Sequence, residues 1–295
     1  MNSLAELTGV HKRYGKTVAL DGLDLQVRDR ELLAVLGPNG AGKTTAISLL
    51  LGLQEADSGS ACLFGKSPHD LDTRRKVGVM MQEAVLPAEL HVREQIDLVA
   101  SYYPEPMTPA AAMEMTNTTA LAKRPYGKLS GGQKRQVQFA VAVCGRPRLL
   151  FLDEPTVGLD IQARKLMWAT LRQLVEQGSS IVLTTHYLEE AEALADRVVV
   201  LGKGRVIASG TVNEIRANVV RKQITCSTTL ALELIRSWPE VESVTRDQQG
   251  THINANNAEA MVRRLMAADE DLQDLEVRRA GLAEAFTELT QEAAS

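Results

Sequence analysis

Hydrophobic and polar positions alternate along the start of the chain and then give way to continuous apolar runs. Leu23–Val27 alternates apolar and polar side chains, which is typical of a strand with one buried face. Leu32–Leu36 is apolar throughout, as in a strand covered on both faces, and it stops at the turn-forming residues Gly37–Gly40. A helical pattern follows over Lys43–Leu51. The pattern therefore predicts strands over the first 40 residues, then a tight turn and a helix.

Two further buried strands are predicted later in the chain. Leu149–Leu152 ends in acidic residues and a proline, and Ser180–Thr185 ends at His186. A helix over Tyr187–Ala195 then leads into a strand over Arg197–Leu201. Because strands and helices alternate, we expect a largely parallel α/β sheet.

Two regions differ from this pattern. His, Met, Pro, Thr and Ala dominate from about Leu71 to Leu121, where we expect helices over Val92–Tyr103 and Pro109–Ala122.

Past about Val219 the predicted order is βαββαβ with a trailing helix, which suggests a small ferredoxin-like domain. Its predicted elements are a strand at Gln223–Ser227, a helix at Ala231–Ser237, a hairpin of Val241–Asp247 and Thr251–Ala255 around the turn Gln248–Gly250, a helix at Ala258–Ala268, a strand at Leu272–Arg278 and a helix at Leu282–Leu289.

Length and composition fit two globular domains and narrow the class of partner. The chain has 295 residues, of which 44% are hydrophobic and 24% charged. Lys and Arg number 33 against 37 Asp and Glu, a net charge of −4, so no nucleic-acid partner is expected. No apolar run approaches the roughly 18 residues that span a bilayer, and no signal peptide begins the chain. We expect a cytoplasmic protein that reaches a membrane only through another protein.

A phosphate-binding loop is the first motif that carries chemistry. Gly37–Thr44 fits the pattern G-x-x-x-x-G-K-[ST], with a buried strand before it and a helix after it. The glycines let backbone N–H groups turn inward around a polyphosphate, and the helix N-terminus adds a positive dipole end. Lys43 would supply a charge to the β- and γ-phosphates, and the Thr44 hydroxyl would bind Mg²⁺. A glycine-rich corner without a ligand is the alternative, which the flanking strand and helix disfavour.

Two acidic residues end the buried strand Leu149–Leu152. Asp153 and Glu154 stand where an open α/β sheet places its ligand site. Asp153 would hold Mg²⁺, directly or through water, and Glu154 would polarise the attacking water. Taken alone, the pair is better explained as a cap on the next helix. Together with the phosphate loop, it indicates a hydrolytic site.

Leu129–Gln133 opens a predicted helix over Gln133–Val143. A helix start of this kind presents free N–H groups and a hydroxyl to an anion, although by itself it is only an N-cap. The order of motifs along the chain adds to this interpretation. That order is the phosphate loop, Gln82 after an apolar run, Leu129–Gln133, the acidic strand end, Thr156–Asp160 and His186 after a strand.

This ordered set resembles the ATP-binding subunit of ABC transporters over about residues 4–215. The resemblance implies an α/β P-loop NTPase fold of ABC type, with a mostly parallel sheet, an antiparallel β portion and a helical subdomain. We expect the ATP-binding domain over residues 1–220, its helical subdomain over about residues 83–145, and the ferredoxin-like accessory domain over residues 221–295.

The resemblance also implies roles for single residues. Tyr14 would stack on adenine, Gln82 would touch Mg²⁺ or water and sense the membrane subunit, His186 would contact the γ-phosphate, and Asp160 would link two sites across a dimer. The implied ATP-binding set is Tyr14, Gly37, Pro38, Asn39, Gly40, Ala41, Gly42, Lys43, Thr44 and Thr45, with Ser130, Gly131, Gly132, Gln133 and Asp160 from an opposing subunit; Glu154, His186 and Lys43 would be catalytic, and Thr44, Gln82 and Asp153 would hold the metal.

Cofactors and partners follow from the same resemblance. ATP and Mg²⁺ would be bound between two copies of the chain, or between it and a paralogous ATPase, and hydrolysis would energise a separate permease on the cytoplasmic face of the inner membrane. Three segments are similar to ATPases of ABC-2-type exporters: Thr184–Arg197, Pro155–Asp160 and the C-terminal Leu282–Thr290. We therefore expect an ABC-2-type permease.

The permease would dock at Gln82–His91 and the helical region after it. His91–Glu94 departs from the commoner Thr-Val-Arg-Glu, and His is a poorer N-cap than Thr.

Two alternative functions are weighed against this one. An importer ATPase more often carries an appendage that resembles a β-barrel or a ligand-sensing domain, whereas βαββαβ is predicted here. A soluble ABC ATPase acting on ribosomes or DNA carries two ATPase units or a long coiled coil. One ATPase unit and a mild negative charge count against it. Nothing in the sequence specifies the transported substrate.

Overall fold

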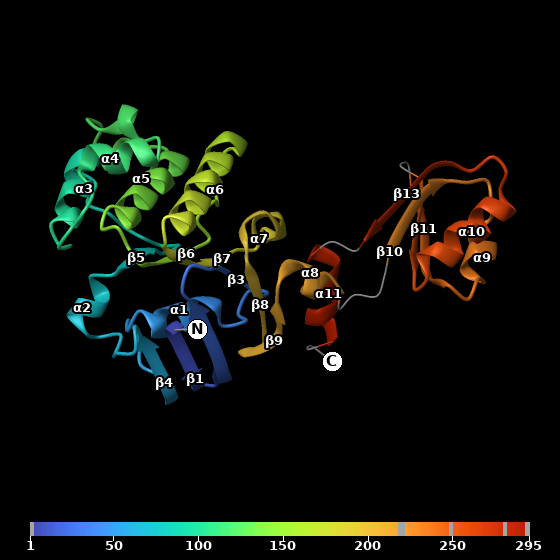
Figure 1. Ribbon diagram of the computed structural model, residues 1–295, viewed down its shortest axis with the longest axis horizontal. Helices are drawn as coiled ribbons and strands as arrows, with labels where there is room; N and C mark the ends of the chain where they lie inside the picture. The colour runs from blue at the N-terminus through green and yellow to red at the C-terminus, as the bar shows by residue number, and fades with distance from the viewer. Residues whose placement is uncertain (1–2, 218–221, 248–249, 280–281, 293–295) are drawn as a thin grey trace. The chain divides into compact units, whose positions relative to one another are not determined.

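The computed structural model describes residues 3–217, 222–247, 250–279 and 282–292 (Figure 1). The chain divides into two compact units, residues 1–212 and residues 213–291. The boundary that the sequence predicts falls between residues 220 and 221, which lie outside the described residues. The predicted domain limits therefore stay a prediction.

A six-stranded sheet forms the centre of the first unit. Its first five strands in spatial order are parallel to their neighbours, and the last pairs antiparallel. Three central strands are buried at every residue, which is why they appear in the sequence as short, nearly continuous apolar runs. In spatial order the strands are β5 (Val77–Met80), β6 (Leu149–Asp153), β7 (Ser180–Thr184), β3 (Leu32–Leu36), β8 (Arg197–Gly202) and β9 (Arg205–Gly210). The predicted parallel α/β sheet is confirmed.

An antiparallel sheet of three strands completes the first unit. The order is β2 (Thr17–Arg28), β1 (Ser3–Tyr14) and β4 (Ser58–Leu63). In β2 the side chains of Leu23, Leu25 and Val27 are buried and those between them are exposed, as the alternation predicts. These side chains share one core with helix α1 (Lys43–Leu50), which places the helix that follows the phosphate loop between the two sheets.

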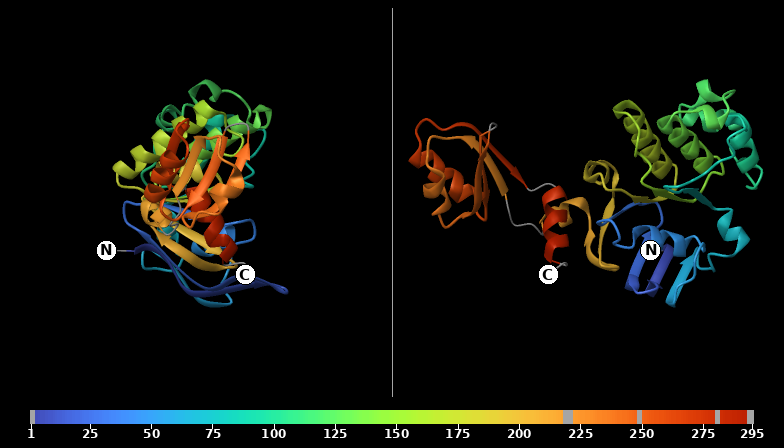
Figure 2. Two further views of the ribbon diagram at one scale, coloured as in Figure 1. Left: turned by 90° about the vertical axis from the view of Figure 1, so that its right-hand side faces the viewer. Right: turned by 180° about the vertical axis from the view of Figure 1, so that it is seen from behind.

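A group of helices has a small core of its own. Helices α3 (Val92–Ala100), α4 (Pro109–Met115) and α5 (Gly131–Val143) pack around buried side chains such as Ile96 and Val137. Seen from behind, these green helices group at one end of the first unit, apart from the blue strands β1 and β2 (Figure 2). Two 3₁₀ turns, Thr119–Leu121 and Tyr126–Lys128, lead from α4 to α5.

Two of these helices are shorter than the sequence predicts. Helix α4 ends at Met115 because Asn117 takes a left-handed φ of 52°. The Thr118 N–H then donates to the Met113 carbonyl at 2.8 Å, and the Asn117 N–H to the Glu114 carbonyl at 3.2 Å, which is a Schellman cap. Helix α3 ends at Ala100, shortly before Pro104, which cannot continue it. The expected helices over Val92–Tyr103 and Pro109–Ala122 are wrong at these ends.

Other elements of the first unit were not predicted. They are β4, β5, β9, the short helix α2 (Leu71–Arg74) and the long helix α6 (Ile161–Glu176); α7 (Leu188–Leu194) is close to its predicted range. Helix α8 (Val212–Ala217), at the start of the second unit, was not predicted either. The described residues include no helix that combines the length and the apolar character needed to cross a membrane.

The second unit is built around one antiparallel sheet in the order β11-β12-β10-β13. One face of the sheet packs Ile224 and Ile253 into a common core with Met261 and Leu265 of the helix Ala258–Ala268. The element order βαββαβ is the predicted one, although Gln248 and Gln249 of the predicted turn lie outside the described residues. The elements are β10 (Lys222–Ser227), α9 (Leu232–Arg236), β11 (Val241–Asp247), β12 (Gly250–Ala255), α10 (Ala258–Ala268), β13 (Gln273–Arg279) and α11 (Leu282–Glu292).

Candidate functional site

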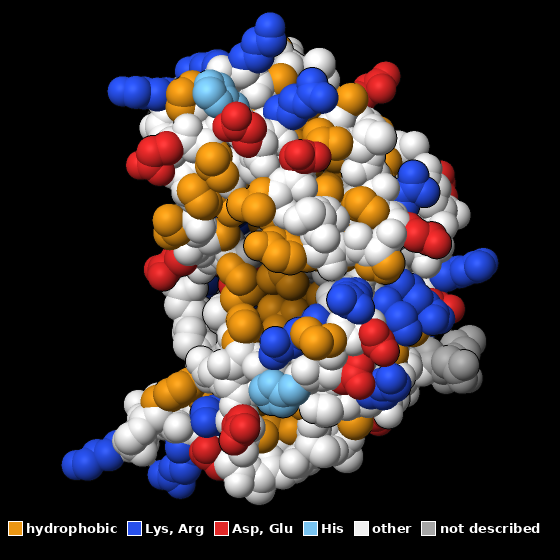
Figure 3. Space-filling model, turned by 90° about the vertical axis from the view of Figure 1, so that its left-hand side faces the viewer, with side chains coloured by type: hydrophobic (Ala, Val, Ile, Leu, Met, Phe, Trp, Pro, Cys, Tyr) orange, Lys and Arg blue, Asp and Glu red, His pale blue; other side chains and the backbone are white. Residues whose placement is uncertain are grey.

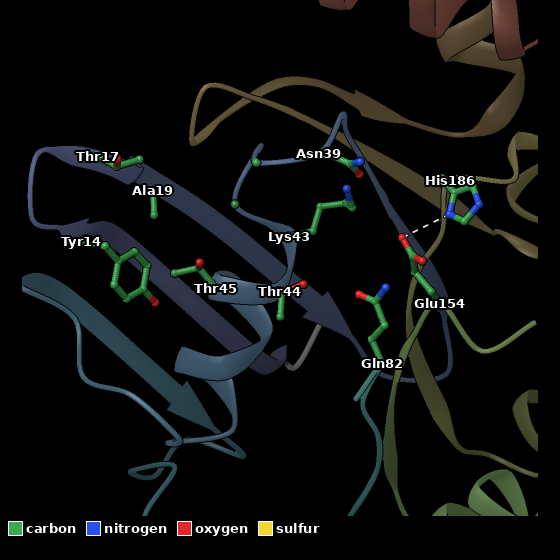
Figure 4. Close-up of a pocket in the computed structure, with 12 residues that line it drawn as sticks. Tyr14, Thr17, Ala19, Asn39, Lys43, Thr44, Thr45, Gln82, Glu154 and His186 are labelled. Atoms are coloured by element: carbon green, nitrogen blue, oxygen red, sulfur yellow. Dashed lines mark ion pairs between the residues drawn. The ribbon is translucent and has the colours of Figure 1, made fainter. Parts of the chain in front are cut away.

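The candidate site lies at one edge of the six-stranded sheet. Strands β3, β7 and β6 are parallel neighbours, so the segments that follow their carboxyl ends come together there. A cavity of about 720 Å³ opens at this edge. Figure 4 shows Tyr14 at one end of it, Glu154 and His186 at the other, and Lys43 and Thr44 between them. Its lining comprises Tyr14, Thr17, Ala19, Asn39, Gly40, Gly42, Lys43, Thr44, Thr45, Gln82, Glu154 and His186.

The phosphate loop forms the middle of the cavity. Gly42 has a φ of 103°, and a Cβ there would lie 2.6 Å from the Ala19 carbonyl oxygen, so the loop requires glycine at this position. The Lys43 ammonium donates to the Gly37 carbonyl at 2.7 Å and to the Pro38 carbonyl at 3.1 Å. Burial lowers the pKa of Lys43, and the nearby carboxylates of Glu154 and Asp153 oppose that shift. The loop thus holds a partly desolvated cation beside the cavity.

Asp153 lies beneath the cavity, where two hydroxyls hold its carboxylate. Thr44 donates to one oxygen at 3.2 Å, and Thr184 donates to the other. The described residues gather no cluster of three or more His, Cys, Asp or Glu that would hold a metal alone. Mg²⁺ commonly takes one or two carboxylates together with substrate phosphates and waters. The oxygens of Thr44, Asp153 and Gln82 fit that pattern.

Glu154 and His186 lie together at one end of the cavity. The His186 Nδ1 atom lies 3.2 Å from a carboxylate oxygen of Glu154, as the dashed line in Figure 4 shows. Glu154 has a left-handed φ of 50°, which is uncommon for a residue with a side chain. Its backbone N–H donates to the Thr184 carbonyl at 3.0 Å, which ties β6 to β7 at this point.

The far end of the cavity includes two residues that sequence reasoning missed. The Tyr14 side chain is 45% exposed, and its hydroxyl donates to the Gln54 side chain. Thr17 and Ala19 line the cavity beside it. Alternate residues of a strand face the same side. Because a strand begins at Thr17, just after Tyr14 and Gly15, its alternation could have placed Thr17 and Ala19 on the side of Tyr14.

Three predicted residues of the phosphate loop do not line the cavity. Pro38 is exposed, and Gly37 and Ala41 are buried. A Cβ at Gly37 would lie 2.7 Å from the Leu201 carbonyl oxygen and 2.9 Å from the Ala41 Cβ. The structure therefore gives Gly37 a packing role beneath the loop.

The segments predicted to act from an opposing subunit also lie outside the cavity of their own chain. Ser130 caps α5: the Gln133 N–H donates to its hydroxyl at 3.3 Å, and the Gln133 side chain accepts from the Ser130 N–H at 3.1 Å. Asp160 caps α6 by accepting from the Ala163 N–H at 2.8 Å. Within one chain both act as N-caps, and their predicted roles toward ATP stay predictions.

A buried carboxyl lies behind His186. Glu190 is fully buried; one of its oxygens accepts from the Trp168 indole N–H at 3.0 Å, and the other has no hydrogen-bond partner among the described residues. Burial raises the pKa of Glu190 above its ordinary value, outweighing the lowering by its polar neighbours. The Glu190 carboxyl thus joins helix α7 to Trp168 of α6 in a buried setting.

Comparisons with known proteins agree with this geometry. The family model for ABC transporters matches residues 20–157. A Nod factor export ATP-binding protein from Burkholderia thailandensis is 43% identical over 68% of this chain and 68% of its own. A daunorubicin resistance ATP-binding protein from Streptomyces coeruleorubidus is 36% identical over 96% of this chain and 94% of its own.

Solved structures give the same fold. The structure of an ATP-binding subunit of an ABC transporter has a TM-score of 0.68 and 28% identity, and covers 73% of this chain and 93% of that one. A dimeric bacterial ABC transporter cassette has a TM-score of 0.64 and 26% identity, and covers 70% of this chain and 98% of that one.

The chain belongs to the ATP-binding subunits of ABC transporters. The predicted P-loop fold of ABC type is confirmed, and the activity of the chain is ATP hydrolysis.

The buried Glu190 predicts a pH dependence of stability. Its raised pKa means that the folded state holds a proton that the unfolded state releases above the ordinary value of 4.5. The free energy of unfolding should therefore fall as the pH rises from 4.5 through the folded-state pKa. Glu190→Gln should not lose this contribution, so its stability relative to the unmutated chain should rise with pH. Urea unfolding over this range measures the difference, with the exposed Glu189→Gln as the control. Parallel curves for Glu190→Gln and the unmutated chain would contradict the assignment.

Proposed function

We propose that two copies of this chain close head to tail around two molecules of ATP and Mg²⁺ and energise an ABC-2-type export permease. The observation that carries the ATP chemistry is the meeting of Lys43, Asp153, Glu154 and His186 at one sheet edge.

Each residue has a separate task in this proposal. The backbone N–H groups of the loop and the Lys43 ammonium bind the β- and γ-phosphates. Glu154 accepts a proton from the water that attacks the γ-phosphate in line, and His186, 3.2 Å from Glu154, contacts that phosphate. Thr44, Asp153 and Gln82 would hold Mg²⁺, which would supply positive charge against the charge that develops on the phosphate. Tyr14 stacks on the adenine at the other end of the cavity.

The position of the helix starts supports the proposed dimer. Ser130–Gln133 and Asp160 lie outside the cavity of their own chain, yet the N-terminus of α5 at Ser130 is suited to bind an anion. In a head-to-tail pair, the start of α5 in one copy faces the phosphate loop of the other. ATP then completes the interface and draws the two copies together.

The names of two relatives support export. The Burkholderia protein is named for Nod factor export and the Streptomyces protein for daunorubicin resistance. We infer an ABC-2-type permease partner, and a position for this chain on the cytoplasmic face of the inner membrane. The second unit would be a ferredoxin-like accessory domain, which the strand order β11-β12-β10-β13 supports.

The proposed docking surface lies on the side of α2 and α3. Hydrophobic side chains gather in a hollow on this face (Figure 3). The departure at His91 leaves the start of α3 intact, because the Glu94 carboxylate accepts from the His91 N–H at 2.8 Å. Five large apolar side chains between residues 71 and 102 are exposed: Leu71, Val79, Val85, Leu98 and Tyr102.

The first test replaces the proposed base. Glu154→Gln keeps the size and removes the proton acceptor, so turnover should fall by about 10²-fold or more while ATP binding persists. Steady-state phosphate release and equilibrium ATP binding measure the two effects. Glu105→Gln, at an exposed position outside the cavity, controls for the loss of one carboxylate. A Glu154→Gln chain that hydrolyses ATP near the unmutated rate would refute the assignment.

The second test separates the two halves of a site. Ser130→Arg blocks the start of α5, and Lys43→Ala removes the loop cation, so each chain alone should be inactive. A mixture forms dimers in which one site combines the intact loop of one chain with the intact α5 of the other. ATPase activity should reappear on mixing, with at most one working site per mixed dimer. No recovery, or an unmutated activity strictly linear in protein concentration while the chain is mostly monomeric, would count against the dimer.

The third test addresses docking. Val85 is 91% exposed, so Val85→Glu should leave the ATPase activity of the isolated chain unchanged. It should weaken binding to membrane vesicles that contain a co-expressed ABC-2-type permease, because a charge opposes apolar contact. Met266→Glu, at an exposed apolar residue of α10 in the second unit, is the matched control. Equal binding by both variants, or strong binding of the unmutated chain to protein-free lipid vesicles, would contradict the proposal.

A further inference from the structure

Arg135 of helix α5 has an unusual environment for a charged side chain. It is only 7% exposed, yet the described residues offer it no carboxylate partner within ion-pair distance. Its Nη1 atom donates to the Gln138 side chain at 3.2 Å, and its other hydrogen bonds go to main-chain carbonyl oxygens. An arginine can serve several acceptors in this way because its planar guanidinium carries five N–H donors in a fixed fork.

One side of the guanidinium holds the segment after β5. Nη1 donates to the Met81 carbonyl and to the Gln82 carbonyl, each at 3.2 Å. Gln82 is the residue whose side-chain amide points into the cavity beside Glu154 (Figure 4). The main chain that carries this amide is therefore tied to α5.

The other side of the guanidinium holds the end of β6. Nη2 donates to the Asp153 carbonyl at 2.7 Å and to the Glu154 carbonyl at 2.6 Å, and Nε donates to the Pro155 carbonyl at 3.3 Å. Three successive carbonyls of the acidic strand end thus bond to one side chain. The Arg135 guanidinium therefore joins the segment after β5 to the end of β6. No other side chain among the described residues is shown to bond to the carbonyls of both segments.

This bridge coincides with the strained backbone of the proposed base. Glu154 has a φ of 50°, a conformation that a residue with a side chain keeps only when its neighbours enforce it. The Thr184 carbonyl fixes its N–H from one side, and Arg135 fixes its carbonyl from the other. The direction of the Glu154 carboxylate therefore depends on both contacts.

We propose that Arg135 is a positioning residue for ATP hydrolysis, which holds the main chain of Glu154 so that the carboxylate faces the attacking water. The inference rests on the proposed function, because it assumes Glu154 as the base. Helix α5 begins just after Ser130, so the helix that reaches the partner's ATP also sets the base of its own chain. Engagement at one site of the dimer is thereby linked to base placement at the other.

The test uses Arg135→Lys in the full chain. Lysine keeps the charge but presents a single nitrogen, which cannot bridge both loops. The kcat should fall by about 10²-fold, as expected when a reacting group is displaced by about 1 Å. The KM and the equilibrium ATP affinity should change far less than kcat, because Arg135 does not line the cavity and its hydrogen bonds go to none of the residues Gly37–Thr44. Arg93→Lys, at an exposed arginine of neighbouring α3, should behave as the unmutated chain.

A double-mutant comparison separates positioning from a merely structural role. In a Glu154→Gln chain the base is already gone, so adding Arg135→Lys should lower the residual rate far less than it does in the unmutated background. The same factor in both backgrounds, or ATP affinity lost together with kcat, would overturn the proposal.

Gln138→Met provides a second variant if Arg135→Lys does not fold. It removes one of the six hydrogen bonds of the guanidinium, together with the bonds that Gln138 donates to the Ala84 carbonyl and the Tyr126 hydroxyl, and it conserves the side-chain volume. The kcat should fall by a smaller factor at constant KM. A normal kcat in every folded variant would overturn the positioning role alone. An unmutated chain without ATP turnover would instead refute the proposed function itself.

Discussion

The parallel pairing of β6, β7 and β3 is the constraint on which the site depends. Because β7 pairs with both of the other strands, the segments after all three emerge at one edge of the sheet. The phosphate loop, the acidic pair and His186 are spread over more than 140 residues of sequence, and this register makes them neighbours. Thr184 shows how closely the strands are joined, since it bonds to Asp153 through its side chain and to Glu154 through its carbonyl.

The same edge concentrates groups that are costly to bury. Lys43, Asp153 and Arg135 are charged and almost fully buried, and Glu190 is a carboxyl without a second hydrogen-bond partner among the described residues. Buried charges are tolerated when hydrogen bonds compensate for lost solvation, as the carbonyls around Lys43 and Arg135 do. Burying these groups lowers the stability of the fold. It also fixes the charged side chains in a partly desolvated site that is suited to binding phosphates.

The central elements and most of the cavity could be predicted because their signals are local. A buried strand, a glycine turn and a helix lie next to one another at Leu32–Leu50, and the acids directly follow their strand. The role of Arg135 was not predicted because its hydrogen-bond acceptors are backbone carbonyls of two distant loops. Every residue has such a carbonyl, so no residue type in the sequence indicates the contact. Thr17 and Ala19 were missed because they are small residues, and the end of α4 was missed because a single left-handed Asn117 decides it.

A crystal structure of the Glu154→Gln chain with ATP and Mg²⁺ tests the central claim most directly. The account predicts two copies related by a twofold axis, with the γ-phosphate between Lys43 of one copy and Ser130 of the other. It also predicts Mg²⁺ beside Thr44 and Asp153. ATP bound away from the loop Gly37–Thr44, or held by one copy with the start of α5 turned away from every phosphate, would contradict the account.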